Sequence, residues 1–237
     1  MFCTRCQGIE LIYFRKLDVE ALNIQGNIRR IDCKVCKNFI AITENETIIN
    51  IDKIIDNSQN GWKKVRSNRE KIIYYALSQI IYPEIDKPEK EKYEAIYDYA
   101  DNVDEIFIRW INGRPIGFYT VKLKGTEIHG STEKYSMNTL DTAYIRSQYR
   151  NCGFGMEILY DIVNRYSDQD IGFSKPISYG MFQVLNKFLT AHKEYRLRFW
   201  EIENGGIEGS IKLVWFIIQR KKKISSIAIK IITNGIV

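Results

Sequence analysis

One segment constrains the fold of this chain more than any other, because it joins a strand, a polar turn and a helix that opens on glycine. The segment runs from Leu140 to Leu159. Residues 140–145 are predicted to form a strand, and a helix is predicted over 153–166. The apolar residues of that helix recur at helical spacing and define one buried face: Ile158, Leu159, Ile162 and Val163.

The turn between this strand and helix has the features of a phosphate site. The first turn of a helix carries free backbone N–H groups and the positive end of the helix dipole, and a bound pyrophosphate satisfies both. Gly153 and Gly155 let the backbone approach a phosphate without a side-chain clash, and Arg150 adds a charge-assisted contact. Glycine in the first turns of a helix costs stability, so we interpret the two glycines as functional.

The rest of the chain is predicted to alternate between helices and strands. A helix over 66–82 is expected to begin at a Ser67 or Asn68 cap and to end at Pro83. Asn112-Gly113 predicts a tight hairpin, because both central residues of a type I′ turn need positive φ. Further helices are predicted over 89–99 and 179–191, strands over 105–111, 116–123, 171–173, 196–202, 212–218 and 224–232, and loops over 125–136 and 203–209.

The turn also resembles a known motif. The run Gln148-Tyr149-Arg150-Asn151-Cys152-Gly153-Phe154-Gly155 is similar to the Arg/Gln-x-x-Gly-x-Gly/Ala motif of the GNAT acetyltransferases. The predicted order of elements from Ile48 to Ile218 resembles the family order of strand, two helices, three strands, helix, strand, helix and two strands. Within that superfamily, residues 140–159, 173–178 and 200–203 resemble the soluble lamin-associated protein group.

The resemblance implies an α+β fold of the GNAT type. Its central sheet is expected to be mixed, mostly antiparallel and splayed at the fourth and fifth strands, with helices on both faces. Acyl-CoA would enter the gap, and its pantetheine arm would pair with the backbone of Ala143, Tyr144 and Ile145. A strand N–H near Tyr144 would polarise the thioester carbonyl. The pyrophosphate would lie on Arg150, Asn151, Cys152, Gly153, Phe154 and Gly155.

The implied activity is N-acetyl transfer. Acetyl would pass from acetyl-CoA, the co-substrate, to an amine by direct attack, and the acceptor would be a protein lysine, a protein N-terminus or a small amine. Acceptor specificity in this superfamily comes from loops that differ between members, here 125–136 and 203–209. The sequence does not identify the acceptor.

The catalytic groups are less well defined than the cofactor turn. Asp141 is the only carboxylate on the predicted fourth strand and is the candidate general base, although it could equally face solvent or cap a loop. Tyr179 is the candidate acid for the leaving thiolate, against the alternative of ordinary packing. His129 and Glu133 are weaker loop candidates. Without a catalytic carboxylate the chain would be a non-catalytic adaptor that binds CoA or a protein.

Two cysteine pairs mark a separate module at the start of the chain. Cys3-x-x-Cys6 and Cys33-x-x-Cys36 have the ligand type and pairing of a closed, structural Zn²⁺ site, so we expect a zinc-ribbon-like module over 1–45 and an acyltransferase domain over 46–237. Gly8 and Asn38 are expected to adopt the positive φ of the turns after each pair. Nearby basic residues would contact nucleic acid in an alternative function, or more simply form a solvated surface: Arg29, Arg30, Lys34 and Lys37.

Charge and hydropathy limit the compartment and the partners. The net charge of +6 is compatible with an acyl-CoA, an acidic protein or a nucleic acid as partner. The sequence has no apolar stretch of about 18 residues, so no membrane association is expected. Paired cysteines and the lack of a secretory signal at Met1 favour an intracellular protein of the cytoplasm or nucleus.

Overall fold

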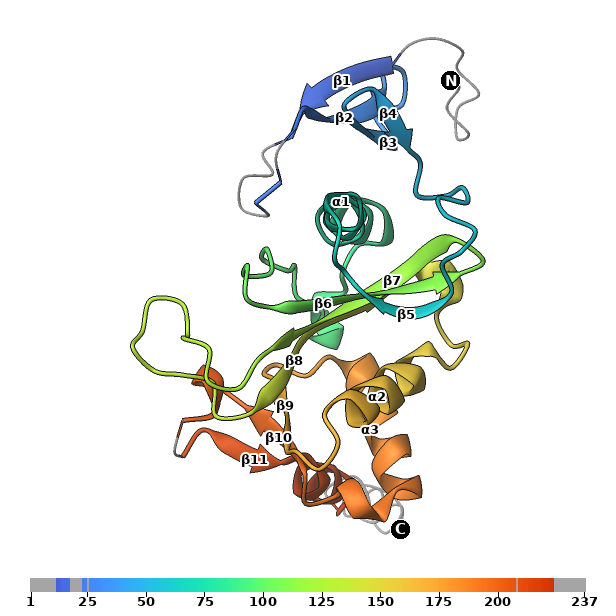
Figure 1. The fold of residues 1–237 in the computed structure, drawn as a ribbon. Coiled ribbons are helices and arrows are strands. Elements are labelled where there is room, and N and C mark those ends of the chain that lie inside the picture. Colours follow the sequence, from blue (N-terminus) through green and yellow to red (C-terminus); the bar gives the residue numbers. More distant parts are fainter. Residues whose placement is uncertain (1–11, 18–22, 25, 208, 224–237) are drawn as a thin grey trace, which may run out of the picture. The chain divides into compact units, whose positions relative to one another are not determined.

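The computed structural model describes residues 12–17, 23–24, 26–207 and 209–223 (Figure 1). The chain divides into two compact units. The first unit comprises residues 1–88, 96–120 and 142–152, and the second comprises residues 89–95, 121–141 and 153–237. In the described part of the chain, no helix combines the length and the apolar character that a bilayer crossing requires.

The first unit begins with a four-stranded antiparallel sheet, drawn in blue in Figure 1. Its order is β1-β2-β3-β4, and β4 pairs with β3 through Ile42 and Ile49. Buried isoleucines lie on both of its faces, Ile28 and Ile42 on one and Ile31 on the other, each at most 1% exposed. The strand bounds are β1 Ile12–Lys16, β2 Ile28–Cys33, β3 Phe39–Glu44 and β4 Thr47–Ile49.

A long helical segment follows in the same unit. It starts as α1 (Asn68–Tyr75), where the Ser67 hydroxyl accepts from the Glu70 N–H and the Glu70 carboxylate accepts from the Ser67 N–H. This capping box confirms the predicted start at Ser67. The helix continues as the π-helical segment η2 (Ala76–Asp86).

The prediction that Pro83 ends this helix is wrong. Pro83 lies inside η2, which runs on to Asp86. Beyond the proline, the Lys87 N–H donates to the Tyr82 carbonyl at 2.8 Å, a bond of five-residue span. Proline removes only its own N–H donor, and the wider turn lets the chain keep its helical path past it.

One hydrophobic cluster joins the elements of the first unit. Figure 1 shows α1 between the four-stranded sheet and strands β5 to β7. The buried side chains of α1 and η2 contact apolar residues from both directions, so the four-stranded sheet shares its core with the helix. The members include Ile28, Ile42, Ile49, Ile72, Ile73, Leu77, Ile80, Ile108, Trp110, Phe118 and Tyr144.

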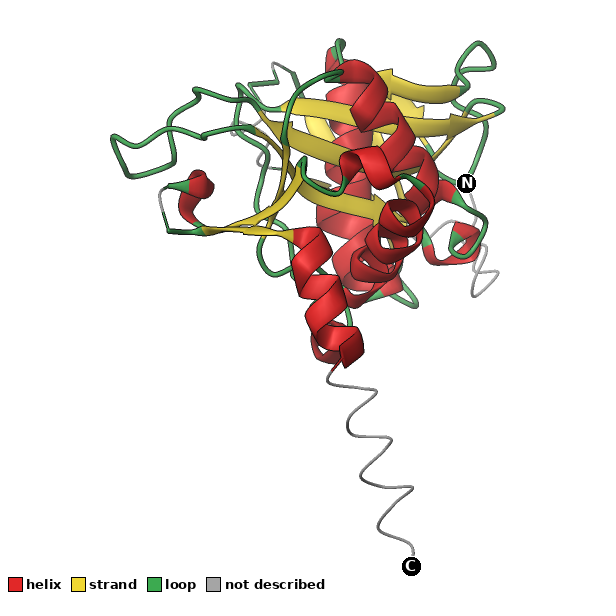
Figure 2. Ribbon diagram, turned by 90° about the horizontal axis from the view of Figure 1, so that it is seen from below, coloured by secondary structure: helices red, strands yellow, loops and turns green. Residues whose placement is uncertain are grey.

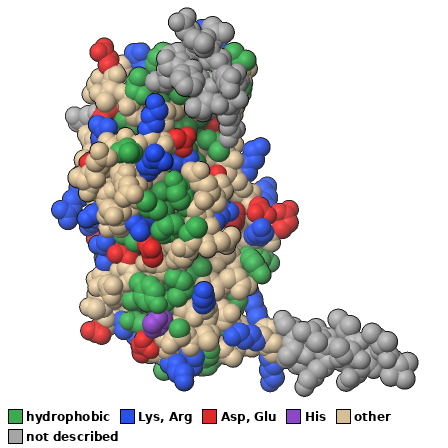
Figure 3. Space-filling view, turned by 90° about the vertical axis from the view of Figure 1, so that its right-hand side faces the viewer, with side chains coloured by type: hydrophobic (Ala, Val, Ile, Leu, Met, Phe, Trp, Pro, Cys, Tyr) green, Lys and Arg blue, Asp and Glu red, His purple; other side chains and the backbone are tan. Residues whose placement is uncertain are grey.

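The prediction of a helix over 89–99 is wrong. Only the single 3₁₀ turn η3 (Lys90–Lys92) forms, and the chain is irregular from there to β6. Two large apolar side chains of this segment remain outside, with Tyr93 65% and Ile96 66% exposed, whereas Tyr97 packs against the core. A short helix needs a continuous buried apolar face to be stable, and one packed ring does not provide it. Figure 3 shows one face of the molecule, where exposed apolar side chains lie among lysine and arginine side chains.

A seven-stranded sheet has the order β11-β10-β9-β8-β7-β6-β5. β5 and β6 are antiparallel, as are β10 and β11, whereas β8, β9 and β10 are parallel neighbours. The mixed α+β architecture is therefore confirmed. Asn112 (φ 46°) and Gly113 (φ 75°) form the predicted hairpin between β6 and β7. The strand bounds are β5 Gly61–Lys64, β6 Glu105–Ile111, β7 Arg114–Lys122, β8 Asn138–Ile145, β9 Ile171–Ser174, β10 Phe199–Ile202 and β11 Ile211–Leu213.

The second unit contains two packed helices, α2 (Phe154–Arg165) and α3 (Tyr179–Ala191). Both predicted helices are confirmed, and α3 begins and ends at the predicted residues. The rings of Tyr160 and Phe188 meet edge to face at 5.3 Å between the two helices, which lie among the red ribbons of Figure 2. The buried core of this unit includes Ile158, Leu159, Ile162, Ile171, Phe173, Leu185, Phe188, Leu189, Phe199, Ile202 and Val214.

The strand predicted over 212–218 is only partly correct. β11 ends at Leu213, and residues 214–223 are helical. Val214 and Ile218 are buried, whereas Phe216 between them is 61% exposed. A strand would place all three on one face, and the spacing of four between the two buried residues is that of a helix. The strand predicted over 224–232 lies outside the described residues.

Candidate functional site

The predicted strand–turn–helix unit is present. β8 ends at Ile145, a single 3₁₀ turn, η4, spans Ser147–Tyr149, and α2 begins at Phe154. Between them the backbone takes left-handed conformations at Asn151 (φ 62°) and Gly153 (φ 90°). Successive left-handed and right-handed residues turn backbone N–H groups toward a common point, which is the geometry of an anion-binding loop.

The start of α2 has no side-chain cap, unlike the starts of α1 and α3. Ser67 caps α1 and Ser178 caps α3 with their hydroxyls. The residue at the same position of α2 is Gly153, which has no side chain to accept from the first N–H groups. Glu157 in the first turn adds a negative charge near the positive end of the helix dipole, but Gly153 offers the first N–H groups no side-chain acceptor, and an anion could accept from them.

The two glycines of the motif are needed for different reasons. Gly153 has φ 90° and open space around the position of a Cβ, so it is required by its backbone conformation. Gly155 has an ordinary φ, but a Cβ there would lie 2.8 Å from Cγ2 of Val184 in α3. Gly155 therefore permits close packing of α2 on α3. The sequence interpretation, which assigned both glycines to phosphate approach, missed this second role.

Arg150 lies folded over the turn that it belongs to. Its Nε donates to the carbonyl of Ile145 at 3.1 Å. Cys152 is exposed in the same turn, and its thiol contacts the Arg150 carbonyl at 3.5 Å. The arginine is thus held close to the backbone that the motif would present to a phosphate.

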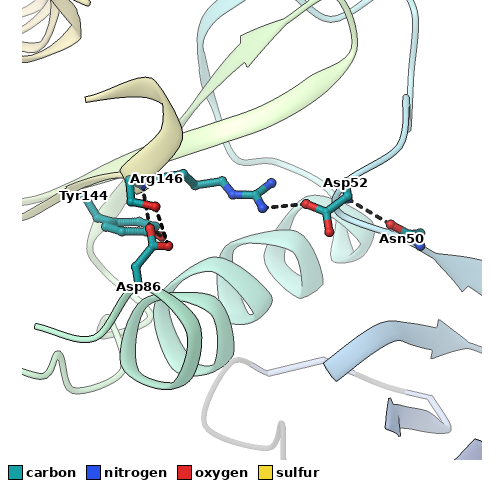
Figure 4. A network of polar contacts seen from close by, with 6 residues as sticks. Asn50, Asp52, Asp86, Tyr144 and Arg146 are labelled. Atoms are coloured by element: carbon teal, nitrogen blue, oxygen red, sulfur yellow. Dashed lines mark hydrogen bonds and ion pairs between the residues drawn. The ribbon is translucent and has the colours of Figure 1, made fainter. Parts of the chain in front are cut away.

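A polar network that includes the buried phenol of Tyr144 holds the end of β8, as Figure 4 shows. The carboxylate of Asp86, at the end of η2, accepts from the Tyr144 hydroxyl at 2.5 Å, the Ser147 N–H at 2.6 Å and the Ser147 hydroxyl at 2.8 Å. Tyr144 is 3% exposed. Burial and the neighbouring Asp86 raise the pKa of Tyr144 above its ordinary value, so the phenol remains a donor.

An ion pair lies directly after the last residue of β8, Ile145. Arg146 is 9% exposed and donates to Asp52 at 2.5 Å, and the Asp52 N–H donates to Asn50 at 2.9 Å (Figure 4). Asp86 and Asp52 were missed from the sequence, because they lie 61 and 94 residues from their respective partners, Ser147 and Arg146. The one available signal was the alternation of Tyr144 and Arg146 on one face of a strand.

The catalytic candidates are not brought together by any described contact. Asp141 lies on β8, is half-buried, and accepts from the Ser174 hydroxyl at 2.7 Å. Tyr179 is the first residue of α3 and is 56% exposed. His129 and Glu133 are exposed in the 125–136 loop. Ser174, at the end of β9, is a partner of Asp141 that the sequence did not indicate.

The second cysteine pair forms a tight turn after β2. The Lys37 N–H donates to the Cys33 carbonyl at 2.9 Å, and the Asn38 side-chain amide donates to the Cys36 sulfur at 3.0 Å. The left-handed residue of the turn is Lys37 (φ 59°), so the expectation for Asn38 is wrong by one position. Cys3, Cys6 and Gly8 lie outside the described residues. Within the described ranges, no group of three or more potential metal ligands is present.

Arg30, expected to be part of a basic surface beside this turn, is buried instead. It is 4% exposed, donates through both terminal nitrogens to Glu84 at 2.5 Å, and donates from Nε to Asp32 at 2.7 Å. Its charge is therefore used inside the protein. A surface pocket of about 380 Å³ lies beside it and is lined by Arg15, Arg30, Asp32, Cys33, Lys37 and Glu84.

The chain is similar in sequence to two distant mammalian proteins. Protein FAM169B of Mus musculus is 28% identical over 196 residues, which are 76% of this chain and 55% of that protein. Protein FAM169BP of Homo sapiens is 28% identical over 124 residues, covering 51% of this chain and 64% of that protein. The chain thus spans less than two thirds of the length of either relative.

Among solved structures, an acetyltransferase from Vibrio fischeri is similar at a TM-score of 0.28 and 16% identity, over 47% of this chain and 93% of that one. A likeness at this TM-score does not by itself support a function. No family model matches the chain.

Proposed function

We propose that this chain binds acyl-CoA through β8 and the turn that follows it, and transfers the acetyl group of acetyl-CoA to an amine. The observation that carries the proposal is the turn at 148–155, where left-handed residues lead into a helix start with no side-chain cap. The pyrophosphate would accept from the N–H groups of Gly153, Phe154 and Gly155, with Arg150 beside it. The sequence resemblance to the GNAT acetyltransferases independently assigns the same residues.

The backbone of β8 supports a role for this strand in holding the pantetheine arm. The Arg146 N–H donates to the Ile116 carbonyl of β7, so the even-numbered residues at this end of β8 hydrogen-bond toward β7. The N–H and carbonyl groups of Ala143 and Ile145 therefore point away from β7. An N–H that polarises a thioester would belong to one of these two residues, and Tyr144 would support the strand through its side chain.

Asp141 and Tyr179 are proposed as general base and general acid. Ser174 donates to one carboxylate oxygen of Asp141, Oδ1, and this contact would orient the second oxygen, Oδ2, toward the proton of an attacking ammonium or of a bridging water. The neutral amine would then attack the thioester carbonyl, forming the amide bond and breaking the bond to sulfur. Tyr179, exposed at the start of α3, would protonate the leaving thiolate.

We further propose that Cys3, Cys6, Cys33 and Cys36 bind one structural Zn²⁺. The described turn supports this, since Cys33 and Cys36 lie three residues apart in a tight turn with an amide donor on one sulfur, as metal-bound thiolates require. Four protein thiolates would leave no open position on the metal. Its contribution would be to the folding of the β1–β4 sheet.

The binding proposal is tested by thermal unfolding in the presence of CoA. At a ligand concentration about 100 times the Kd, the wild type is expected to gain roughly 2.7 kcal/mol, or about 5–10 °C in Tm. Gly153→Glu places a carboxylate at the helix start and is expected to abolish the gain. Gly125→Glu is the matched control, because Gly125 has a similar φ (85°) and equally open surroundings. A wild type that CoA does not stabilise would refute the proposal.

Transfer is separated from binding by the release of free CoA from acetyl-CoA with a panel of amines and peptides. The wild type is expected to exceed Gly153→Glu on at least one acceptor, and Asp141→Asn to reduce the rate by about 10²–10⁴. CoA binding without release on any acceptor would identify a non-catalytic adaptor. Binding to DNA or RNA at low salt, with no response to CoA, would instead favour a nucleic-acid function of the cysteine module.

A further inference from the structure

The side of β8 that faces away from β7 is paired with β9 over only part of its length. In the first unit, Ala143 and Ile145 direct their backbone groups away from β7, as derived above from the bond between Arg146 and Ile116. The pairing of β8 with β9 ends at Leu140, although β8 continues five residues further, to Ile145. This length of strand can therefore accept a ligand that pairs as an added strand.

Two side chains already occupy the carbonyls of this edge. The Tyr97 hydroxyl donates to the Ala143 carbonyl at 2.8 Å, and Arg150 Nε donates to the Ile145 carbonyl at 3.1 Å. Arg150 comes from the turn that directly follows the strand. Tyr97 comes from a segment 46 residues earlier, so its contact is a tertiary one. Each side chain takes the position that an amide N–H of a paired ligand would take.

Tyr97 reaches the strand from an irregular segment that other contacts also hold, since Tyr99 stacks on Tyr75 at 5.9 Å and Ala100 is buried. Its ring stacks on Tyr82 of η2 at 4.7 Å, and its carbonyl accepts from the Gln79 side chain at 3.1 Å. Its neighbours are open to solvent, with Ile96 66% and Tyr99 40% exposed. The segment from Tyr93 to Asp104 contains no helix or strand. Because this segment contributes no strand to the sheet, a local shift of the Tyr97 ring would leave the backbone hydrogen bonds of the sheet intact.

We propose that Tyr97 caps the side of β8 to which acyl-CoA would bind. Its hydroxyl would compete with the pantetheine arm for the Ala143 carbonyl. The inference rests on the proposed CoA-binding function and adds a regulatory element to it. In the absence of ligand the hydroxyl satisfies a carbonyl that would otherwise lose its partner. When an extended diamide pairs with the edge, its N–H replaces the hydroxyl, and the 93–104 segment is released from β8.

The proposal predicts that removing one oxygen atom improves ligand binding. Tyr97→Phe keeps the ring and its stack on Tyr82 but no longer competes for the carbonyl. The variant is expected to bind CoA roughly three- to ten-fold more tightly than wild type, the range that corresponds to one net hydrogen bond. The measurement is isothermal titration calorimetry of CoA into the full chain. Tyr93→Phe, in the same segment and 65% exposed, is the control and is expected to bind like wild type.

A second ligand isolates the pantetheine arm. Adenosine 3′,5′-bisphosphate carries the nucleotide end of CoA without the amides, so its affinity is expected to be equal in wild type and Tyr97→Phe. A gain for both ligands would show a general effect on the fold and would overturn the cap. Equal or weaker CoA binding by Tyr97→Phe would also overturn the cap. If the wild type binds CoA in that case, the proposed function is still supported. If wild type and variant both fail to bind CoA, the proposed function fails, and the cap with it.

Discussion

Two single carboxylates, those of Asp86 and Asp52, position the end of β8 through hydrogen bonds. Asp86 receives three hydrogen bonds from Tyr144 and Ser147, and Asp52 receives one from Arg146. All of these donors lie directly before the turn at 148–155. A carboxylate that accepts several hydrogen bonds fixes its donors more closely than an apolar contact of the same size, because the bonds are directional. The turn is therefore held in place by residues that would not themselves touch a phosphate.

Tyr144→Phe tests this arrangement at the level of one atom. The variant is expected to lose about 1.5–3 kcal/mol of unfolding free energy at pH 7, since a hydrogen bond to a charged group is removed. The folded-state pKa of Tyr144 is raised above the ordinary 10.0 by burial and by Asp86. Folding therefore retains the proton, so the stabilisation is complete below about pH 10 and declines above it.

Urea unfolding of both proteins from pH 7 to 11 measures this effect. The difference between wild type and Tyr144→Phe is expected to be constant up to about pH 10 and then to shrink. Tyr93→Phe should differ from wild type by less than about 0.5 kcal/mol throughout, because its ring is exposed. A difference that grows above pH 10 would mean that Asp86 does not hold the phenol protonated.

At the scale of elements, one ion pair joins the four-stranded sheet to the long helix. Arg30 of β2 is buried, and both of its terminal nitrogens contact Glu84 of η2. Glu84→Gln is expected to cost about 1–2 kcal/mol, because a buried guanidinium loses a charged acceptor while Asp32 remains. Chemical denaturation is the measurement.

The control for that variant is another glutamate paired with a basic residue. Glu89 contacts Lys92 at 2.8 Å, but both side chains are about half exposed, at 51% and 49%. Glu89→Gln should therefore change stability by less than about 0.5 kcal/mol. Equal losses in the two variants would show that burial of Arg30 does not determine the strength of its pair.

The elements that the sequence predicted well are those with a strong local signal. β6 was predicted to the residue because its apolar run is bounded by an Asn-Gly turn, and α3 because its spacing is regular and Ser178 precedes it. The errors came where tertiary contacts decide. Pro83 does not end η2, and residues 89–99 have helical spacing but pack one large side chain, Tyr97, against the core. Residues 214–218 were predicted as part of a strand, because alternation and helical spacing coincide over short apolar runs.

At the scale of the whole molecule, loss of the proposed metal from the cysteine module is expected to destabilise residues outside that module. The β1–β4 sheet contributes Ile28, Ile42 and Ile49 to the same cluster as α1 and η2. Removal of the proposed Zn²⁺ by a chelator is therefore expected to lower the Tm of the full chain in one cooperative transition, and Cys33→Ser to do the same without chelator. Cys152→Ser is the control, because Cys152 lies in the turn before α2.

Native mass spectrometry before and after chelation counts the metal. One Zn²⁺ per chain is expected in the wild type and none in Cys33→Ser. A wild type purified without metal, with free thiols and an unchanged Tm in chelator, would contradict the zinc proposal. Loss of metal with no loss of Tm would show that the β1–β4 sheet is stable without it.

How much of the candidate site could be foreseen depends on distance along the chain. The turn at 148–155 is contiguous, so its strand and its helix start were predicted from the sequence, whereas the left-handed conformations of Asn151 and Gly153 were not. Asp86, Tyr97, Asp52 and Ser174 reach β8 from 33 to 94 residues away, and nothing in their local sequence distinguishes them from other surface residues. Their pairing follows from the order of strands and from the path of the long helix, which a single sequence does not specify.

The shared core of the first unit has a practical consequence for anyone who divides this chain for expression. A cut after residue 45 would leave β4 on the far side of the break, detached from β3. It would also uncover the apolar side of α1 and η2, including Ile72, Ile73 and Leu77. Such a fragment would expose a large apolar surface and would be prone to aggregate, whether or not it binds a cofactor. Fragments that retain the first four strands avoid that exposure.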